Sequence, residues 1–334
     1  MSAIVKIIDM HSHFIPTLFA DMIQKNNNLT ADIVYKDGEK FISHEQGYIY
    51  PFLPEFYDMD VKRQRMDELG IDMSILSPAP PLFYYWTDKE TSKYVAQMVN
   101  DELFNFINKD TKRFSMMATV PMNSVEYAIE ELERIYRKSN GTVKFVEIGT
   151  NIEGELISNP KFEPFFAKVV ELNMTVFLHP YYVGNKSGLE NYYLTNLLGN
   201  PFDTTIAAVH LMLSGFINKF PSLKICLAHA GGFLPYQIGR LQHGYNVREE
   251  PKEKNKETPP LELLKRFYFD SITFEQKSLE FLVNIVGADK VMVGTDFPFD
   301  MGEYTIVEKM HNLHLSTENK EKIFHRNVTN LLSE

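Results

Sequence analysis

Apolar and polar positions follow two alternating patterns along this chain. Short apolar runs with strand character are separated by longer segments whose apolar positions recur every three or four residues, which is typical of amphipathic helices. The clearest helical segments span residues 91–108, 125–138, 162–172, 206–220 and 276–286. The strand-like runs lie at residues 4–9, 73–77, 114–120, 143–149, 174–179, 223–229, 267–270 and 291–296. These alternations predict an α/β fold, a (β/α)8 TIM barrel, with a doubly wound open sheet as the alternative.

Local signals agree with these boundaries. Ser124 precedes the helix predicted at 125–138 as a candidate N-cap, and Asn140-Gly141 follows that helix as a stop signal. An open sheet of this kind commonly binds nucleotides, but no glycine-rich dinucleotide fingerprint follows the first strand and the sequence has no Walker loop. The barrel is therefore the favoured fold.

Two insertions interrupt the regular alternation. Residues 26–54, after the first strand, are polar at first and then aromatic, and residues 249–260, after the sixth strand, are charged and end in proline. Loops after barrel strands surround the active-site face, so we expect the first insertion to cover the site, although it could be a surface excursion with no role. The simplest prediction is a single barrel domain over residues 1–334.

Composition restricts the possible partners. The chain has 334 residues, 44% of them hydrophobic, and a net charge of -10, with no cluster of Lys or Arg. Nucleic acid and anionic membranes are therefore poor partners. The single cysteine, Cys226, lies in an apolar run and excludes an internal disulfide. Without a signal-peptide pattern or a membrane-spanning run, we expect a cytoplasmic protein.

The first candidate for chemistry is the pair His11 and His13, in a strand-like context near the N-terminus. Side chains at i and i+2 of a strand point to the same face, so the two imidazoles can take adjacent positions around one divalent metal. Three later strand ends also carry ligand-type residues, namely His179, His229 and Asp296. In a barrel these positions meet at the active-site end and predict a zinc-type catalytic site.

Each position also has a purely structural interpretation. A histidine at a strand end can bond backbone carbonyls, and Asp296 can cap the next helix. Asp9 can orient a ligand or satisfy backbone amides. Glu147 should point into the barrel, because Val146 and Ile148 beside it are apolar, and we assign it no role.

These motifs together resemble the amidohydrolase superfamily, in particular its group that is like aminocarboxymuconate-semialdehyde decarboxylase. The resemblance covers nearly the whole chain and is carried by Asp9-Met10-His11-Ser12-His13, His179-Pro180, Leu213-Ser214-Gly215, residues 223–232, Gly239-Arg240 and Gly294-Thr295-Asp296-Phe297-Pro298. It implies a distorted TIM barrel with one Zn²⁺, with Mn²⁺ or another divalent metal possible, and no organic cofactor. The implied metal ligands are His11, His13, His179 and Asp296.

The resemblance also implies roles for other residues. His229 would activate metal-bound water or transfer a proton, together with Asp296. Arg240 matches an arginine that binds a substrate carboxylate across a dimer interface, so the chain would be a homodimer. A second carboxylate-binding arginine of the family is replaced here by Tyr50. Aromatic residues near the mouth, Tyr50, Trp86 and Phe297 among them, favour a flat acid by stacking.

Three functions follow from these residues. The leading one is a metal-dependent, non-oxidative decarboxylase of a small unsaturated or aromatic carboxylic acid. The second is a hydrolase of an amide, lactone or ester bond, which the loss of the arginine favours. The third is a metal-stabilised binding protein without catalysis.

Overall fold

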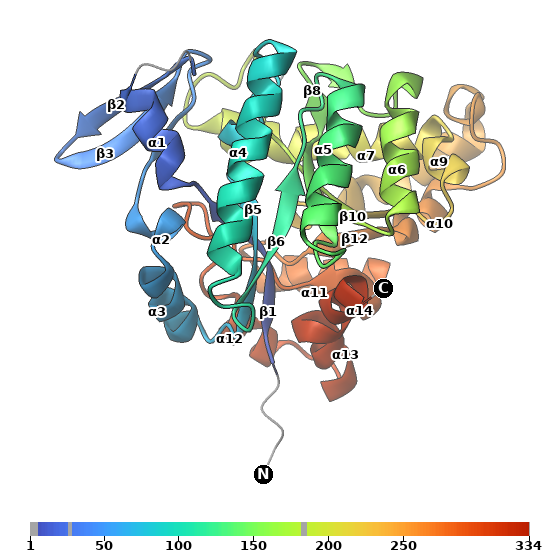
Figure 1. Cartoon of the computed structure of the whole chain (residues 1–334). Helices are drawn as coiled ribbons and strands as arrows, with labels where there is room; N and C mark the ends of the chain where they lie inside the picture. Colours follow the sequence, from blue (N-terminus) through green and yellow to red (C-terminus); the bar gives the residue numbers. More distant parts are fainter. Residues whose placement is uncertain (1–5, 26–28, 182–185, 334) are drawn as a thin grey trace.

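The computed structural model describes residues 6–25, 29–181 and 186–333. Its main sheet consists of parallel strands in the order β1-β5-β6-β7-β10-β11-β12-β13, with helices packed around them (Figure 1). The strands are β1 (Ile8–Phe14), β5 (Met73–Pro78), β6 (Phe114–Thr119), β7 (Phe145–Gly149), β10 (Thr175–His179), β11 (Lys224–Leu227), β12 (Phe267–Asp270) and β13 (Val291–Met292).

The sheet closes on itself. Backbone N–H groups of β1 reach the chain that follows β13: Met10 N donates to Val293 O at 2.8 Å and His13 N donates to Phe297 O at 2.7 Å. In return, Asp296 N donates to His11 O at 2.8 Å. The predicted TIM barrel is confirmed, and the open-sheet alternative is wrong. The barrel is distorted next to this closure, because on the other side of β1 the register against β5 shifts between Asp9 and Ser12.

The helices largely follow the apolar periodicity. Two predicted segments match α5 and α11 residue for residue, and the Ser124 hydroxyl accepts a hydrogen bond from Tyr127 N as an N-cap. The helices are α1 (Thr17–Gln24), α2 (Pro54–Tyr57), α3 (Met59–Leu69), α4 (Lys89–Ile107), α5 (Val125–Lys138), α6 (Glu163–Glu171), α7 (Asn200–Leu213), α8 (Phe216–Lys219), α9 (Leu234–Val247), α10 (Pro260–Leu263), α11 (Gln276–Val286), α12 (Ile306–Asn312), α13 (Thr317–Glu321) and α14 (Asn327–Ser333).

One predicted helix, 206–220, is broken. The chain forms α7 and α8 instead, separated at Gly215, whose φ of +74° is the left-handed conformation that ends helices. A Cβ at Gly215 would lie 2.8 Å from the backbone oxygen of Lys254, so the close approach of the charged 249–260 segment also requires glycine. The apolar pattern continues across the break, which is why periodicity alone missed it.

Three predicted strands end two or more residues away from the observed end, and all three differences concern the site. The first strand extends to Phe14, so it contains both histidines; residues 4 and 5 of the prediction lie outside the described part. β11 ends at Leu227 and β13 at Met292, so His229 and Asp296 lie in the turns that follow. Both residues have left-handed backbones, with φ of 53° and 61°, which no strand accommodates.

The insertion after β1 forms a small antiparallel sheet of β2 (Ala31–Lys36), β3 (Glu39–His44) and β4 (Ile49–Pro51); residues 26–28 of the predicted segment are not among those described. Its apolar side joins a cluster that includes Phe19, Ile42 and Phe56. In Figure 1 this blue sheet lies beside the upper end of the barrel.

The barrel interior is apolar below the site. Met10, Phe177 and Cys226 belong to an inner cluster to which α14 contributes Val328 and Leu331 at the lower end of the barrel (Figure 1). The thiol of Cys226 is buried, as predicted. Phe177 packs edge-on against His11 with ring centroids 4.8 Å apart, so the apolar core ends where the polar site begins.

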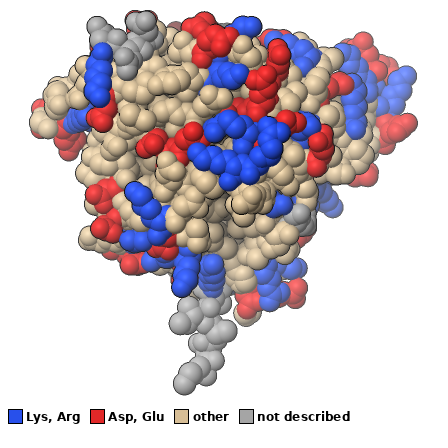
Figure 2. Space-filling model, in the orientation of Figure 1, with Lys and Arg blue, Asp and Glu red and all other residues tan. Residues whose placement is uncertain are grey.

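Charged side chains of both signs are interspersed on the face shown in Figure 2. The ion pair of Lys93 with Glu130 and that of Lys138 with Asp101 join α4 to α5. No helix within the described residues has the length and apolar character needed to cross a bilayer.

Candidate metal centre and active site

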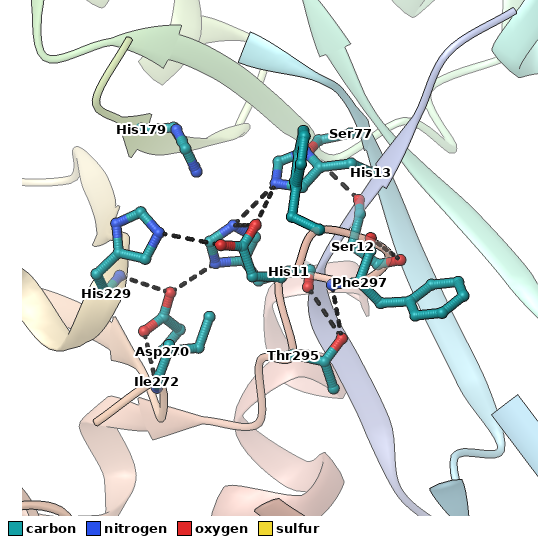
Figure 3. A network of polar contacts seen from close by, with 12 residues as sticks. His11, Ser12, His13, Ser77, His179, His229, Asp270, Ile272, Thr295 and Phe297 are labelled. Carbon is teal, nitrogen blue, oxygen red and sulfur yellow. Dashed lines mark hydrogen bonds and ion pairs between the residues drawn. The ribbon is translucent and has the colours of Figure 1, made fainter. Parts of the chain in front are cut away.

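Four buried side chains converge at the carboxyl end of the barrel (Figure 3). His11 and His13 come from β1, His179 ends β10, and Asp296 follows β13. One nitrogen or oxygen from each lies within 4.8 Å of those from the other three. The structure therefore brings together the four residues that the sequence predicted as metal ligands.

The ring orientation of the first two histidines is fixed from outside the cluster. His11 Nδ1 lies 2.7 Å from Asp270 Oδ2, and His13 Nδ1 lies 3.3 Å from the carbonyl oxygen of Pro78. Both partners are acceptors, so each Nδ1 carries the proton and donates. The Nε2 atoms of His11 and His13 then face each other at 3.1 Å, where they share a hydrogen bond if one is protonated and can both donate lone pairs to a metal.

The third histidine follows the same rule. His179 Nδ1 donates to the carbonyl oxygen of Pro180 at 2.8 Å, while its buried Nε2 has no hydrogen-bond partner. Asp296 Oδ1 lies 2.9 Å from His13 Nε2. Three imidazole nitrogens and a carboxylate oxygen thus converge as electron-pair donors, and only a proton or a metal cation can satisfy them. This donor set fits a divalent metal such as zinc.

The electrostatics agree with a site built for a cation. Burial alone would lower the pKa of His11, but the carboxylates of Asp296 and Asp270 outweigh it and raise that pKa to about 10. Burial lowers the pKa of His13 to about 4 and that of His179 well below its usual value. For Asp296, burial opposes ionisation, yet neighbouring His11 holds the pKa of the carboxyl well below its ordinary range. In the metal-free protein, a proton on His11 therefore supplies the positive charge that stabilises this cluster.

His229 stands beside the cluster and faces the other oxygen of Asp296. Its Nε2 lies 3.5 Å from Asp296 Oδ2, and its ring is partly exposed, whereas the rings of His11 and His13 are fully buried. A histidine at that place can exchange a proton with a molecule held at the cluster. The predicted pairing of His229 with Asp296 is thus present in the geometry.

A cavity of about 540 Å³ opens above these residues, a size typical of small-molecule sites. His179, His229 and Asp296 are among the residues that line it. Its walls come from the insertion, the turn after β5, the loop after β10, the start of α7 and the loop after β13. The residues that line them include Phe41, Gln46, Tyr48, Tyr50, Pro80, Tyr181, Lys186, Asn196, Asn200 and Phe299. The insertion therefore lines the cavity instead of lying apart from it.

Tyr50 is the one predicted substrate-contacting residue that lines the cavity, but its hydroxyl is already engaged. It shares a hydrogen bond of 2.8 Å with His44 Nε2. Burial lowers the pKa of His44 to about 4, so this pair is uncharged at neutral pH. Tyr50 therefore offers a ring and no charge to the cavity.

The other three predicted substrate-contacting residues lie elsewhere. Trp86 packs against Tyr84 behind the cavity wall, and Phe297 faces away, under the ammonium group of Lys62 at 5.0 Å. Arg240 is exposed on α9 and does not reach this chain's cavity. Phe299 contacts the site in place of Phe297, with its ring centroid 5.1 Å from that of His13.

The structure also shows what surrounds Asp9 and Glu147, the two buried carboxylates considered in the sequence analysis. Asp9 accepts hydrogen bonds from the backbone of His11 at 3.0 Å and of Thr295 at 3.1 Å, so it satisfies amides instead of orienting a ring. Glu147 points into the barrel as predicted, and the Ser77 hydroxyl donates to it at 3.2 Å. Burial raises the pKa of Glu147 well above its usual value.

Sequence reasoning missed Asp270, the residue that orients His11. It ends β12, so its position at a strand end was a signal of the kind that identified His179. It also missed Lys186, the only lysine or arginine among the described residues that line the cavity.

Comparison with known proteins is consistent with this site. A protein-family model described as amidohydrolase matches residues 8–332. The chain is 31% identical over 277 residues to 2-amino-3-carboxymuconate-6-semialdehyde decarboxylase of Dictyostelium discoideum, covering 83% of this chain and 77% of that protein. It is 29% identical over 286 residues to gamma-resorcylate decarboxylase of a Polaromonas species, covering 82% and 87%.

Among solved structures, it superposes with a TM-score of 0.81 and 23% identity on a dihydroxybenzoic acid decarboxylase from Polaromonas, covering 98% of this chain and 97% of that one. That crystal structure contains manganese and the inhibitor 2-nitroresorcinol. The likeness extends over the whole barrel, including the insertion.

Proposed function

The chain belongs to the amidohydrolase family, and from this premise we propose that it is a metal-dependent, non-oxidative decarboxylase of a small unsaturated or aromatic carboxylic acid. The observation that supports this most is the placement of His229 and Asp296 beside the donor cluster, where both line an aromatic-walled cavity. The named relatives, which span most of the chain, are decarboxylases of such acids.

His11, His13, His179 and Asp296 would hold the metal, because their donor atoms converge and their other polar atoms are fixed. When bound, a divalent cation there supplies Lewis acidity toward the oxygen atoms of the substrate and the negative charge that develops as CO₂ leaves. The proposed metal is Zn²⁺, with Mn²⁺ the alternative, since a structural neighbour contains manganese.

The chain's own side chains would do the rest. His229 would deliver the proton that replaces CO₂ on the substrate carbon, since its Nε2 is next to Asp296 and its ring borders the cavity. Phe299 and Tyr48 would hold a flat acid between them by stacking and limit its rotation. Lys186 would supply the positive charge that attracts an anionic substrate into the cavity.

We propose that Arg240 acts in a homodimer, by reaching the cavity of the partner subunit. It is exposed on the same face of α9 as Tyr236, four residues earlier, whose side chain is 78% exposed. An exposed tyrosine beside an arginine is a composition typical of interfaces. Analytical ultracentrifugation of the wild type and of Arg240→Ala tests the dimer, and an unchanged KM in the variant would count against the role in substrate binding.

Hydrolysis of an amide, lactone or ester is the second candidate. The observation that favours it is the uncharged Tyr50–His44 pair, which leaves that wall without the basic residue that a second carboxylate would need. The same His229 and Asp296 would then serve to activate water.

A substrate panel separates the two functions. We would assay the metal-loaded protein for CO₂ release with hydroxybenzoates, salicylates and carboxymuconate-like acids, and for hydrolysis with matched esters and lactones. CO₂ release from any acid of the first group supports the decarboxylase, and ester or lactone cleavage without CO₂ release would transfer the proposal to the hydrolase.

A further inference from the structure

We propose that Asp270 is a positioning residue that holds the metal-binding ring of His11 and the backbone of His229 with one carboxylate. It does not line the cavity, so it acts through these two histidines and does not touch the substrate. The sequence analysis assigned no role to Asp270. The inference rests on the proposed function only for its kinetic readout.

The geometry of Asp270 links two parts of the site. Its Oδ2 accepts from His11 Nδ1 at 2.7 Å and from the backbone N–H of His229 at 2.8 Å (Figure 3). Its Oδ1 accepts from the backbone N–H groups of Ala230 at 2.7 Å and Ile272 at 3.1 Å. Asp270 itself is fully buried, and a carboxylate offers acceptor positions for all four bonds.

The backbone that Asp270 holds is an unusual one. His229 and Ala230 have φ of 53° and 55°, and the two glycines that follow also have positive φ. Left-handed backbone is disfavoured for residues with a Cβ, so this turn needs outside support. Successive N–H groups in such a turn point to one side and form a concave anion site, which the Asp270 carboxylate fills.

The chain also makes space for this carboxylate. A Cβ on Gly294 would lie 2.9 Å from Asp270 Cβ and 3.0 Å from His11 Cβ, so only glycine lets β12, β1 and the segment after β13 approach this closely. Asp270, His11 and Gly294 therefore form one packed unit at the closure of the barrel.

These contacts give Asp270 two separate effects. Through His11 it fixes the tautomer that leaves Nε2 free for the metal, an arrangement that raises metal affinity in other metalloproteins. Through the backbone of His229 it fixes the distance of that ring from Asp296. The same oxygen serves both, so a change at Asp270 should alter metal binding and proton transfer together.

Asp270→Asn is the direct test. An amide has one acceptor oxygen, so its NH₂ group must face either His11 and His229 or Ala230 and Ile272, all of which donate. We expect a 10- to 100-fold weaker metal affinity, measured by chelator competition, and an altered visible spectrum of the Co²⁺-loaded protein. At saturating metal, kcat should fall while KM changes little.

The matched control is Asp203→Asn. Asp203 is another largely buried aspartate that accepts a hydrogen bond from a side-chain amide, that of Asn151, but it does not line the cavity. The control should keep the metal affinity and Co²⁺ spectrum of the wild type. An Asp270→Asn variant that behaves like this control would overturn the proposal.

A second measurement covers the case in which Asp270→Asn does not fold. In the wild type labelled with ¹⁵N-histidine, the His11 ring should be protonated at Nδ1 and carry the metal at Nε2; the opposite tautomer would overturn the proposal. Failure of the proposed function can be distinguished from failure of the Asp270 proposal. If the protein releases CO₂ from none of the acids, the metal affinity, the Co²⁺ spectrum and the tautomer still test the role of Asp270.

Discussion

The donor cluster and the cavity wall above it are constructed in different ways. The rings of His11, His13 and His179 are buried, and each has its Nδ1 fixed by an acceptor at the end of a barrel strand or just beyond it. The wall consists of loops and of the inserted sheet. Lys186 is exposed there, and the Tyr50 hydroxyl is hydrogen-bonded to His44 of the inserted sheet.

The difference separates two levels of function. Strand ends hold the cluster with little freedom, so we expect substitutions there to abolish chemistry. Loop residues bring different side chains to the same cavity, so substitutions there should change which acid binds and how tightly, with smaller effects. The predictions below test this separation.

The largest effect is expected from His179→Ala. Its buried Nε2 has no hydrogen-bond partner and is free to bind a metal. Loss of the ring should therefore lower the metal content to background and abolish turnover. Metal analysis after dialysis measures this directly. Retention of a full complement of metal with normal activity would show that His179 is structural.

His229→Ala should keep the metal and lose the reaction. Because His229 contacts Asp296 at 3.5 Å but is not part of the buried donor set, we expect a normal metal content with kcat about 10²- to 10⁴-fold lower. Parallel metal analysis and kinetics are the measurement. If metal is lost along with activity, His229 is a ligand.

Metal affinity should depend on pH through one proton. In the metal-free protein the carboxylates raise the pKa of His11 to about 10 against the effect of burial, whereas burial lowers the pKa of His13 to about 4. Below pH 10 the metal must displace the His11 proton, so apparent affinity should weaken about tenfold for each pH unit lowered between 8 and 6. Calorimetric titration in buffers of different ionisation enthalpy counts the proton; a pH-independent affinity contradicts this account.

Lys186→Met addresses the wall. An exposed charge contributes about 0.2–1 kcal/mol to an ion pair, so KM for an anionic acid should rise about two- to fivefold with kcat unchanged. Lys256→Met, an exposed lysine of the charged 249–260 segment that does not line the cavity, is the control. A fall in kcat as large as that of His229→Ala would erase the proposed separation between wall and centre.

The smallest effect on activity is expected from Tyr50→Phe. Its hydroxyl is bonded to His44, so the variant should lose about 1 kcal/mol of unfolding free energy while KM stays nearly constant. Denaturant unfolding and steady-state kinetics measure the two quantities. A large rise in KM would mean that the Tyr50 hydroxyl leaves His44 to bind the substrate.

Features of the molecule that depend on interactions between residues close in the sequence could be predicted, and features that depend on contacts between distant residues could not. Strand and helix positions follow from local apolar periodicity, and the histidines of β1 share one face because of strand geometry. These local rules were sufficient for the barrel and for the candidate ligands His11, His13, His179, His229 and Asp296. The resemblance to the amidohydrolase superfamily was needed to separate the four donors from His229.

Long-range packing was not predictable in the same way. The left-handed turns at His229 and Asp296 depend on Asp270 and on the closure of the barrel, whose partners are separated by most of the chain. Phe297 and Phe299 illustrate this limit: Lys62 lies over Phe297, whereas the Phe299 ring packs against His13, and local periodicity predicts neither contact.

The most direct test of the central claim is metal analysis of the purified protein coupled to CO₂ release from the acid panel. The account predicts about one divalent metal per chain, held by the four donors, and CO₂ release that disappears when the metal is removed and returns when it is restored. Protein that retains no metal after exposure to Zn²⁺ or Mn²⁺, or that releases CO₂ equally well without metal, would contradict it.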